Sequence, residues 1–504
     1  MAVNQRGIYA SRYGMKVGSP FLKTSPDFKR HRLAGFTFVL LGGLTNQLCL
    51  AQELEAQASA IISCSSTDAR TIQLADILVA ALDRQPQLHI AQENVAKARA
   101  NLIAGRSPFL PKLTLAIQSE RFVPSNPTSP VTVGNVVVGG SAATKTTYGS
   151  IGLNWNLFNS GRDWAGFRAS QADVSSSEAG LSGQLNDTLM LVLSAYTDVY
   201  QSQMEADTQS RVLALQQSIE DRVEEQFRRG LTTQLAIARA QTDVIETSQA
   251  FYQACRAVAD KSAMLAQSIG LHLAPDELYR IEAPLTLPDH NGVNLVASEW
   301  QRYIQDSPSV VAAKESITAA EYRLKQARAA YGPSLSLEGR KDYLGQSVDS
   351  WRTANHLEPN SYRIGLQITQ PMLPMTTEYS AIQSAKSDLR RAQASYQQAL
   401  LDTEGRYHTA FNAMREASAS LKAAEASLSR ADDLLGLTRA LYAAGREDQD
   451  KVQQAQITSN KAANAVKQAD ARLRVASWQV FRATEPMSFV NKLLTQFGID
   501  AANP

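Results

Sequence analysis

Two hydrophobic patterns alternate along the chain. In four segments of about ten residues, apolar and polar positions alternate with a period of two, which predicts β-strands with one apolar and one polar face. These segments begin near Leu113, Ile151, Leu335 and Tyr362. Elsewhere, apolar residues recur at three- and four-residue steps, which predicts helices. No proline occurs in residues 163–229 or 375–485, so unusually long helices are expected there.

The chain is internally duplicated. Residues 227–230 (FRRG) match residues 442–445 (YAAG) at an offset of 215, and the same offset pairs Ala240-Gln241 with Ala455-Gln456. A second pair of landmarks is residues 110–115 (LPKLTL) and 332–337 (GPSLSL). Each half therefore has the predicted order helix, strand, loop, strand, long helix, glycine turn, helix. The loops are expected at residues 122–147 and 344–361, which are rich in Gly, Pro, Ser and Thr.

The long helices carry a narrow seam of alanine and larger apolar residues. The seam includes Leu389, Ala392, Tyr396, Ala399, Leu421, Ala424, Leu428, Ala431 and Leu435. Small side chains in such a seam permit close coiled-coil packing. A soluble four-helix bundle has similar seams, but it does not explain the strands. Gly230 and Gly445 are expected to end helices in the left-handed conformation, with Thr232 and Thr233, or Asp448, capping the next helix.

The strand pattern indicates a membrane sheet. Strands of about ten residues suit a tilted membrane β-strand, although an ordinary half-buried sheet alternates similarly. Aromatic residues cluster near the strand ends, as in a membrane girdle: Tyr148, Phe158, Tyr343, Trp351 and Tyr362. Four strands cannot close a barrel, so several copies must share one; two copies give a filled interior and three begin to leave a lumen.

The predicted fold is mixed α+β and mainly α, with a long α-helical coiled-coil barrel continuous with a transmembrane β-barrel. Each chain contributes four strands, so two copies would give eight strands and three copies, a trimer, would give twelve. Polar residues on one strand face are the candidates for the pore lining. They are Asn154, Asn156, Ser334, Ser336, Arg340, Arg363 and Gln367.

Charge is distributed unevenly. Lys and Arg number 50 against 48 Asp and Glu, and this balance argues against a nucleic-acid-binding protein. Basic residues 29–32, an apolar stretch at 33–44 and small residues up to Ala51 predict a signal peptide over residues 1–51, followed by a linker over 52–70. Cys64 and Cys255 make no disulfide framework, and unpaired thiols are the simpler interpretation, although the residues before Cys64 faintly resemble a lipidation signal.

Together these motifs resemble the outer-membrane efflux protein (TolC) family over roughly residues 71–484. The resemblance rests on the duplication, the Leu-Pro-x-Leu-x-Leu strand start, residues 155–158 (WNLF) and 370–373 (QPML), and the aromatic-x-x-Gly turns. It implies a homotrimer with an outer-membrane barrel and a periplasmic helical barrel in a Gram-negative bacterium. It also implies two repeats, over 71–295 and 296–485, and an equatorial belt made by residues 270–298 and the tail 486–504.

The resemblance further implies a passive exit duct of a tripartite efflux pump or a type I secretion system. Such ducts pass drugs, small molecules or proteins, and they work with a periplasmic adaptor (membrane fusion protein) and an inner-membrane transporter of the RND or ABC type. Adaptors of similar proteins dock at the glycine turns. The corresponding residues here are Arg229, Gly230, Leu231, Ala444, Gly445 and Arg446. Arg446 departs from the pattern, because an apolar residue or threonine is usual there.

Acidic side chains near the second turn narrow the periplasmic entrance of similar proteins. The aligned positions here hold Lys451 and Gln454, so Glu447, Asp448 and Asp450 are the candidates for an acidic gate. Three copies of such acids would repel one another and favour cations. Alternatively, they are solvated acids favoured at a helix N-terminus by the helix dipole.

No catalytic or cofactor motif accompanies these features. The six histidines are scattered without the His-Glu-x-x-His spacing of a zinc site, and no phosphate-binding loop is present. We therefore expect no enzyme activity, no cofactor and no bound metal. The competing hypothesis is a soluble periplasmic coiled-coil scaffold or adaptor that uses the helices alone.

Overall fold

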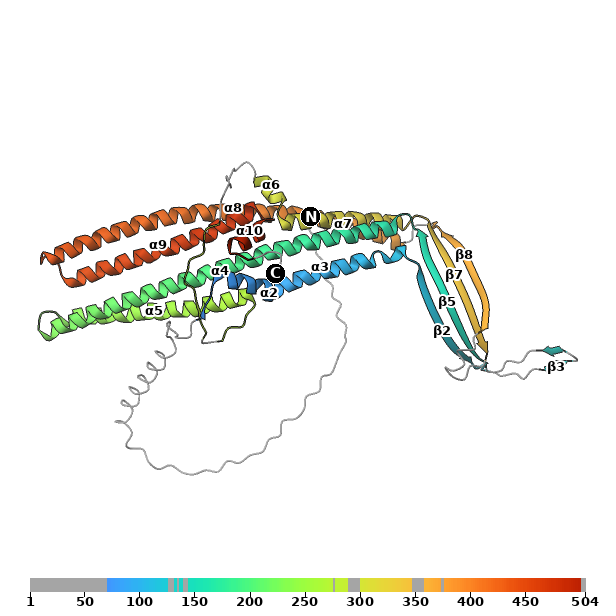
Figure 1. The fold of residues 1–504 in the computed structure, drawn as a ribbon, viewed down its shortest axis with the longest axis horizontal. Helices are drawn as coiled ribbons and strands as arrows, with labels where there is room; N and C mark the ends of the chain where they lie inside the picture. Colours follow the sequence, from blue (N-terminus) through green and yellow to red (C-terminus); the bar gives the residue numbers. More distant parts are fainter. Residues whose placement is uncertain are drawn as a thin grey trace, which may run out of the picture. The chain divides into compact units, whose positions relative to one another are not determined.

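The computed structural model describes residues 70–125, 131–133, 136–138, 144–274, 277–288, 300–346, 358–372 and 376–499. The predicted signal peptide, nearly all of the predicted linker, Trp351 and the last five residues lie outside these ranges. Most of the described chain is helical, with the longer strands gathered at one end of the helices (Figure 1).

One antiparallel sheet contains all four predicted strands, in the order β2-β5-β7-β8. The strands are β2 (Lys112–Phe122), β5 (Thr144–Phe158), β7 (Ser334–Gln346) and β8 (Glu358–Thr369). They are longer than predicted, with 11 to 15 residues each. They extend into both predicted loops, and the first loop also forms a hairpin of β3 (Val131–Val133) and β4 (Val136–Val138). The predicted loop bounds are therefore too wide, because the ladder of hydrogen bonds continues past the apolar alternation.

The long helices occur in two matching hairpins. In each half a helix of 67 or 68 residues turns back into one of 36 residues. The first hairpin is α4 (Arg162–Arg228) with α5 (Gln234–Ile269), and the second is α8 (Thr376–Ala443) with α9 (Gln449–Thr484). At 1.5 Å per residue the longer helices reach about 100 Å. No described helix is both long enough and apolar enough to cross a membrane.

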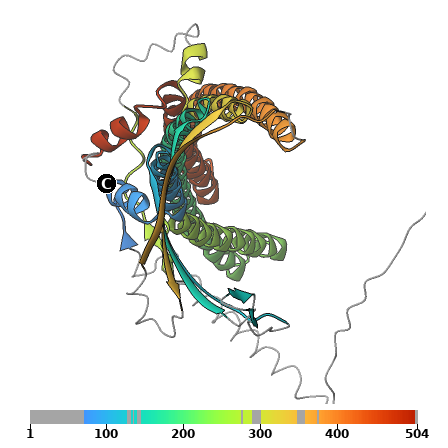
Figure 2. The ribbon, with the colours of Figure 1, turned by 90° about the vertical axis from the view of Figure 1, so that its right-hand side faces the viewer.

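Shorter helices complete the layer next to the sheet. α3 (Pro86–Ala104) packs on α4, and α7 (Pro308–Ala329) packs between α4 and α8. The lateral order near the strands is thus α3-α4-α7-α8, with α3 and α8 at the two edges. Seen from the strand end, the helices form a curved layer rather than a closed bundle (Figure 2).

The main hydrophobic core lies midway along the helices. It joins α2 (Leu74–Arg84), the middle of α4, the ends of α5 and α9, residues 279–285 and α10 (Phe489–Gln496). Two short strands, β1 (Arg70–Thr71) and β6 (Tyr279–Arg280), pair in parallel. Trp478 is fully buried there, and its indole Nε1 donates to the Thr286 carbonyl at 2.8 Å. The described parts of both predicted belt segments pack in this core.

Two smaller elements lie at the junctions between these segments. They are the 3-10 helix η1 (Ser107–Phe109) and α6 (Trp300–Gln305). Cys255 of α5 is buried and disulfide-bonded, so an unpaired thiol is the wrong interpretation for this residue. Its partner lies outside the described residues.

Candidate functional site

The sheet places all seven predicted pore residues on one face. Residues directly opposite each other on neighbouring strands point to the same side of a sheet. The observed register pairs Asn154 with Glu338, Asn156 with Ser336, Ser336 with Gln367, Ser334 with Thr369, and Arg340 with Arg363. The polar residues therefore lie next to one another across neighbouring strands and form one polar face of the sheet.

The opposite face is apolar and exposed within the chain. The side chains of Leu115, Ile364 and Ile368 are 72%, 76% and 74% exposed. Leu113, Leu153 and Leu366 lie on the same face in register. A run of exposed large apolar side chains on this scale marks a surface that is covered by something other than water. Basic residues interrupt this face: Arg121 lies on it in register near the end of β2, and the Lys341 Nζ lies 5.4 Å from the centre of the Tyr343 ring.

The polar face carries acids that the sequence prediction left out of the pore lining. Glu338 and Asp342 alternate with Arg340 along β7, so the period-two signal was available for them too. The Arg340 guanidinium pairs with Asp342 at 2.6 Å, and Asn154 donates to Glu338 at 3.5 Å. The Asp342 carboxylate therefore partly neutralises Arg340.

The sheet has two free edges among the described strands. β2 pairs only with β5, and β8 pairs only with β7. Each edge therefore presents unpaired backbone N–H and C=O groups. Such groups cost several kcal/mol each in a lipid environment, so an open edge does not persist there.

The two glycine turns have the same geometry, which confirms the predicted left-handed glycines. Gly230 and Gly445 have φ angles of 75° and 70°. The Leu231 N–H donates to the Gln226 carbonyl and the Arg446 N–H to the Leu441 carbonyl, both at 2.9 Å. This bond, together with one from each glycine N–H, is the Schellman motif that ends helices.

The residues around the turns differ more than the turns do. Thr233 caps α5 by accepting from the Ala236 N–H at 3.4 Å, as predicted. Asp448 occupies the equivalent capping position of α9, but its side chain makes no capping bond. Leu231 is 74% exposed and apolar, whereas Arg446 is exposed and charged. The described residues at both tips are therefore accessible, with different chemistry.

The three candidate gate acids are not equivalent. Glu447 and Asp448 are exposed in the second turn. Asp450 is half-buried, and its carboxylate pairs with the Arg222 guanidinium of α4 at 3.2 Å. Arg222 also donates to Gln453, whose amide donates to Ser218 of α4 at 3.2 Å. We call Ser218, Arg222, Asp450 and Gln453 the tip clasp, because it joins the two helical hairpins; the sequence alone did not indicate it.

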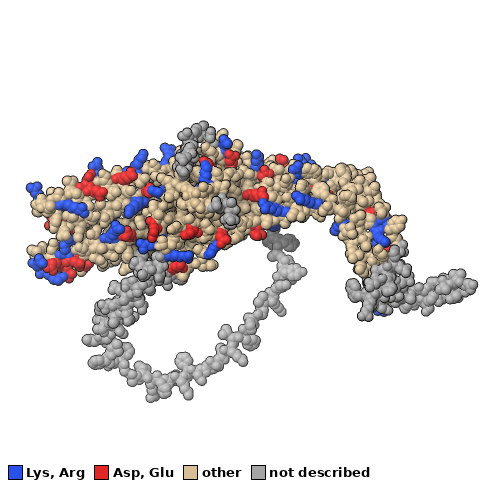
Figure 3. All heavy atoms as spheres, viewed as in Figure 1, with Lys and Arg blue, Asp and Glu red and all other residues tan. Residues whose placement is uncertain are grey.

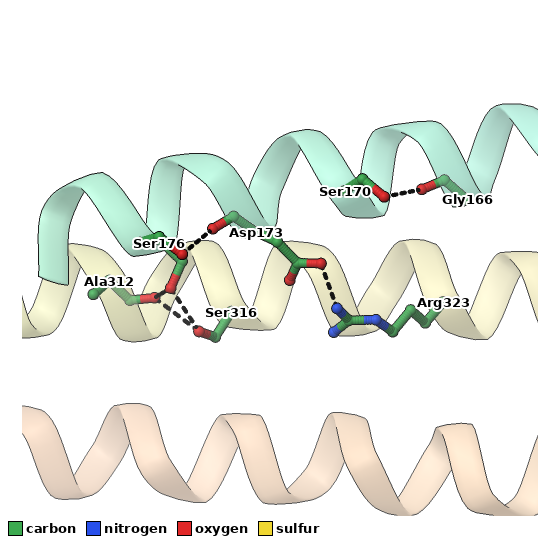
Figure 4. A network of polar contacts seen from close by, with 8 residues as sticks. Gly166, Ser170, Asp173, Ser176, Ala312, Ser316 and Arg323 are labelled. Carbon is green, nitrogen blue, oxygen red and sulfur yellow. Dashed lines mark hydrogen bonds and ion pairs between the residues drawn. The ribbon is translucent and has the colours of Figure 1, made fainter. Parts of the chain in front are cut away.

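Polar contacts also join the hairpins farther up. Glu205 of α4 accepts from Asn464 at 2.6 Å and from Gln468 at 2.8 Å, both on α9. Near the sheet, Asp173 of α4 pairs with Arg323 of α7, and Ser176 contacts Ser316 at 3.0 Å (Figure 4). The space-filling view shows charged side chains of both signs spread along the helices (Figure 3). These contacts link α4 to α9 and to α7 at points outside the main hydrophobic core.

Side-chain bonds to backbone hold the belt against α4. Tyr196 donates to the Ala283 carbonyl at 2.8 Å. Burial, with a smaller contribution from Tyr200, raises the pKa of Tyr196 to about 12. Gln203 donates to the Tyr279 carbonyl at 2.5 Å and accepts from the Ile281 N–H at 3.1 Å. The Tyr196 hydroxyl therefore stays protonated at neutral pH and remains a donor.

A duplicated chain with a two-faced sheet at the end of long paired helices defines a membrane-channel class of protein. Comparison with known proteins identifies its family. The model of the family described as outer membrane efflux protein matches residues 77–271 and 300–484. The chain therefore belongs to the outer membrane efflux protein family, which consists of transport proteins rather than enzymes.

Individual relatives agree with this assignment. Protein CyaE of Bordetella pertussis is 25% identical over 404 residues, which cover 77% of this chain and 80% of CyaE. The fold resembles that of the Campylobacter jejuni CmeC outer membrane channel, with a TM-score of 0.67 and 16% identity over 85% of this chain and 90% of CmeC. It also resembles that of the outer membrane protein VceC from Vibrio cholerae, with a TM-score of 0.66 and 16% identity over 82% of this chain and 96% of VceC.

Family membership decides between the two hypotheses drawn from the sequence. The protein is a channel protein of the outer membrane of a Gram-negative bacterium and extends into the periplasm. A soluble periplasmic scaffold that uses the helices alone does not agree with this location.

Proposed function

We propose that the protein is a homotrimeric exit duct, through which cargo passes passively from an inner-membrane transporter to the exterior. The observation that carries the proposal is the two-faced sheet with two unpaired edges, at the end of helices about 100 Å long. A pore needs a polar inside and an apolar outside, and the register supplies both faces. The repeats 71–295 and 296–485 and the tail 486–504 remain the proposed domains.

Three copies account for the free edges. Pairing β8 of one copy with β2 of the next gives twelve strands and leaves no edge exposed to lipid. The edge helices also expose large apolar side chains that a neighbouring copy can cover. Ile103 of α3 is 68% exposed, and Leu401 and Leu437 of α8 are 62% and 66% exposed. The seven polar-face residues then line the barrel lumen.

Disulfide scanning across the proposed seam tests this arrangement. We expect Ile364→Cys on β8, combined in turn with single cysteines at Leu113, Leu115 and Ile117 on β2, to produce crosslinked dimers and trimers on non-reducing gels of outer-membrane fractions. As a control, Ile364→Cys with Leu153→Cys should give no intersubunit crosslink, because β5 lies inside the sheet. Monomers in every β2 combination would contradict the shared barrel.

The gate is proposed at the second helical tip. Glu447 and Asp448 supply the exposed acids, and three copies would bring six carboxylates together near the axis. The tip clasp holds Asp450 against α4 and so limits how far α9 can move. Opening therefore requires α9 to separate from Arg222, and the acids at the entrance attract cations.

The glycine turns are the proposed docking sites for a periplasmic adaptor, with Arg229, Gly230 and Leu231 at one tip and Ala444, Gly445 and Arg446 at the other. A cysteine at Leu231 carrying a photocrosslinker should capture the adaptor and its transporter in intact cells. An RND-type pump in the captured complex would indicate drug or small-molecule efflux. An ABC transporter would support type I protein secretion. Capture at Leu191→Cys, far from the tips, serves as the control.

A further inference from the structure

Cations lie on aromatic rings where the helices meet the sheet. The Arg168 guanidinium of α4 lies 4.2 Å from the centre of the Trp164 ring. Trp164 stacks on Tyr322 of α7 with ring centres 6.5 Å apart and an angle of 16° between the planes. Lys325 lies 4.7 Å from the centre of the Tyr322 ring. We call these four residues the basic collar.

The collar continues towards the apolar face of the sheet. Trp155 lies on that face, in register with Leu337 and Leu366, and its Nε1 donates to the Phe109 carbonyl at 3.0 Å. The Phe109 ring meets Phe167 of α4 edge-on, with centres 6.3 Å apart. A third cation, Arg106, lies 5.9 Å from the Phe167 ring. Aromatic rings and cations therefore extend from the end of the apolar sheet face onto α4.

The collar points away from the polar face of the sheet. Asn156 of that face donates to Asp163 on α4 at 3.1 Å. Successive helical residues point about 100° apart, so Trp164 and Arg168 point about 100° and 140° away from Asp163. On α7, Arg323 pairs with Asp173 of α4, and Lys325 points about 160° away from Arg323, while Tyr322 reaches Trp164 on the other side of the α4–α7 contact. The collar therefore lies on the side of the helical layer that faces away from the polar face of the sheet.

The collar is basic and forms no ion pair among the described residues, although Arg168 donates to the neutral Gln171 amide at 2.9 Å. Residues 321–328 of α7 contain one acidic residue, Glu321, and three basic residues, Arg323, Lys325 and Arg328. Of the basic residues, Arg323 pairs with Asp173. Residues 162–168 of α4 contain one acidic residue, Asp163, and two basic residues, Arg162 and Arg168. Within the described part of the chain, no carboxylate pairs with Arg168 or Lys325. Two cations held on aromatic rings therefore remain available for an anionic ligand.

The depth of the collar matches the headgroup layer of a bilayer. Arg168 is six residues from the start of α4 and Lys325 four residues from the end of α7, which places both within about 10 Å of the helix ends next to the sheet. Headgroup layers extend about 5–8 Å on each side of the hydrocarbon core. Trp and Tyr are enriched at this level, and Lys and Arg reach it with their long side chains.

We propose that the basic collar binds anionic phospholipid headgroups of the periplasmic leaflet and so fixes the depth of the channel in the membrane. The inference rests on the proposed barrel, which makes the apolar sheet face the lipid-facing one. A second copy of the chain does not fit as the ligand, because α4 and α7 are the two middle helices in the lateral order α3-α4-α7-α8, and a neighbouring copy would meet the edge helices. An adaptor docked at the tips would be about 90 Å away, since 60 helical residues separate Arg168 from Arg228.

Lipid retention by the full-length channel tests the collar. Wild type, Arg168→Gln/Lys325→Gln and the control Lys461→Gln/Lys467→Gln are reconstituted in phosphatidylcholine containing a minor fraction of phosphatidylglycerol. The control removes the same charge from exposed positions of α9. Retained lipid is counted by mass spectrometry after detergent extraction, and channel conductance is recorded in pure phosphatidylcholine.

We expect wild type and control to retain phosphatidylglycerol preferentially, and the collar variant to lose this preference by about fivefold for each cation removed. High salt should reduce the preference of the wild type as well. Equal retention of phosphatidylglycerol by wild type and collar variant, or no preference for it in the wild type, would contradict lipid binding by the basic collar. Normal conductance in that case leaves the exit duct intact, whereas absence of channels from all three proteins counts against the proposed function itself.

Discussion

The helices α4 and α8 occupy equivalent positions in the duplication but have different surroundings. They differ by one residue in length and end in the same glycine turn. Yet sixteen side chains are buried on α4 and four on α8. The reason is position, since α4 lies between neighbours on both sides and α8 lies at an edge. The duplication thus preserves the length and the end of the helix. Its position in the helical layer decides which of its faces are buried within the chain and which stay exposed.

The strongest test of this comparison removes the free face of α8. Leu401→Glu with Leu437→Glu should abolish the trimer, because both side chains are more than 60% exposed in the chain and would be buried by a neighbour. Glutamate keeps a high helix propensity, so the helix itself should persist. Native gels of unheated outer-membrane extracts measure the trimer, and circular dichroism measures the helices. Leu191→Glu on α4, which is 51% exposed, is the control and should leave the trimer intact.

A second test compares the buried core with the edge. Trp478→Ala should lower the free energy of unfolding by about 3–5 kcal/mol, because it empties a fully buried site and removes the indole bond to Thr286. Leu434→Ala on α8, at 50% exposure, should change the stability of the dissociated chain by well under 1 kcal/mol. Denaturant unfolding of the dissociated protein measures both changes. Similar losses from the two variants would show that α8 has a buried face of its own.

A third test separates the acids of the second tip from the tip clasp. Asp448→Ala with Asp450→Ala should raise single-channel conductance and weaken block by multivalent cations, because fewer carboxylates remain at the entrance. Arg222→Gln keeps every acid and releases Asp450 from α4. If it raises conductance while cation block persists, then the clasp limits opening and the acids control selectivity. Unchanged conductance in both variants would move the gate elsewhere.

The smallest expected effect concerns the two glycine turns, which have the same geometry in the two halves of the chain. Gly230→Ala and Gly445→Ala should each destabilise the local turn by about 1–2 kcal/mol, since both residues have φ near +70°. Gly436→Ala, inside α8 with open space around it, should stabilise by about 1 kcal/mol. Hydrogen exchange at the tips measures each change. A marked difference between the two turn variants would show that the turns are not equivalent.

The sequence predicted elements well where one physical rule dominates. Absence of proline placed α4 correctly from near Asp163 to near Arg229, and strict alternation assigned every predicted pore residue to one face. Strand lengths were underestimated, because backbone pairing needs no apolar side chain and extends β5 into a polar segment. The tip clasp was missed, because Arg222 and Asp450 are more than two hundred residues apart and show no pattern that links them.

By itself, the sequence determined the duplication, the helix ends at glycine and the two faces of the strands, because these follow from local conformation and from periodicity. Only the tertiary structure decided that α4 is central and α8 lies at an edge, that Asp450 is held by Arg222, and that Arg168 and Lys325 meet on one aromatic stack. These features depend on contacts between distant segments, and such contacts arise when the helices pack side by side.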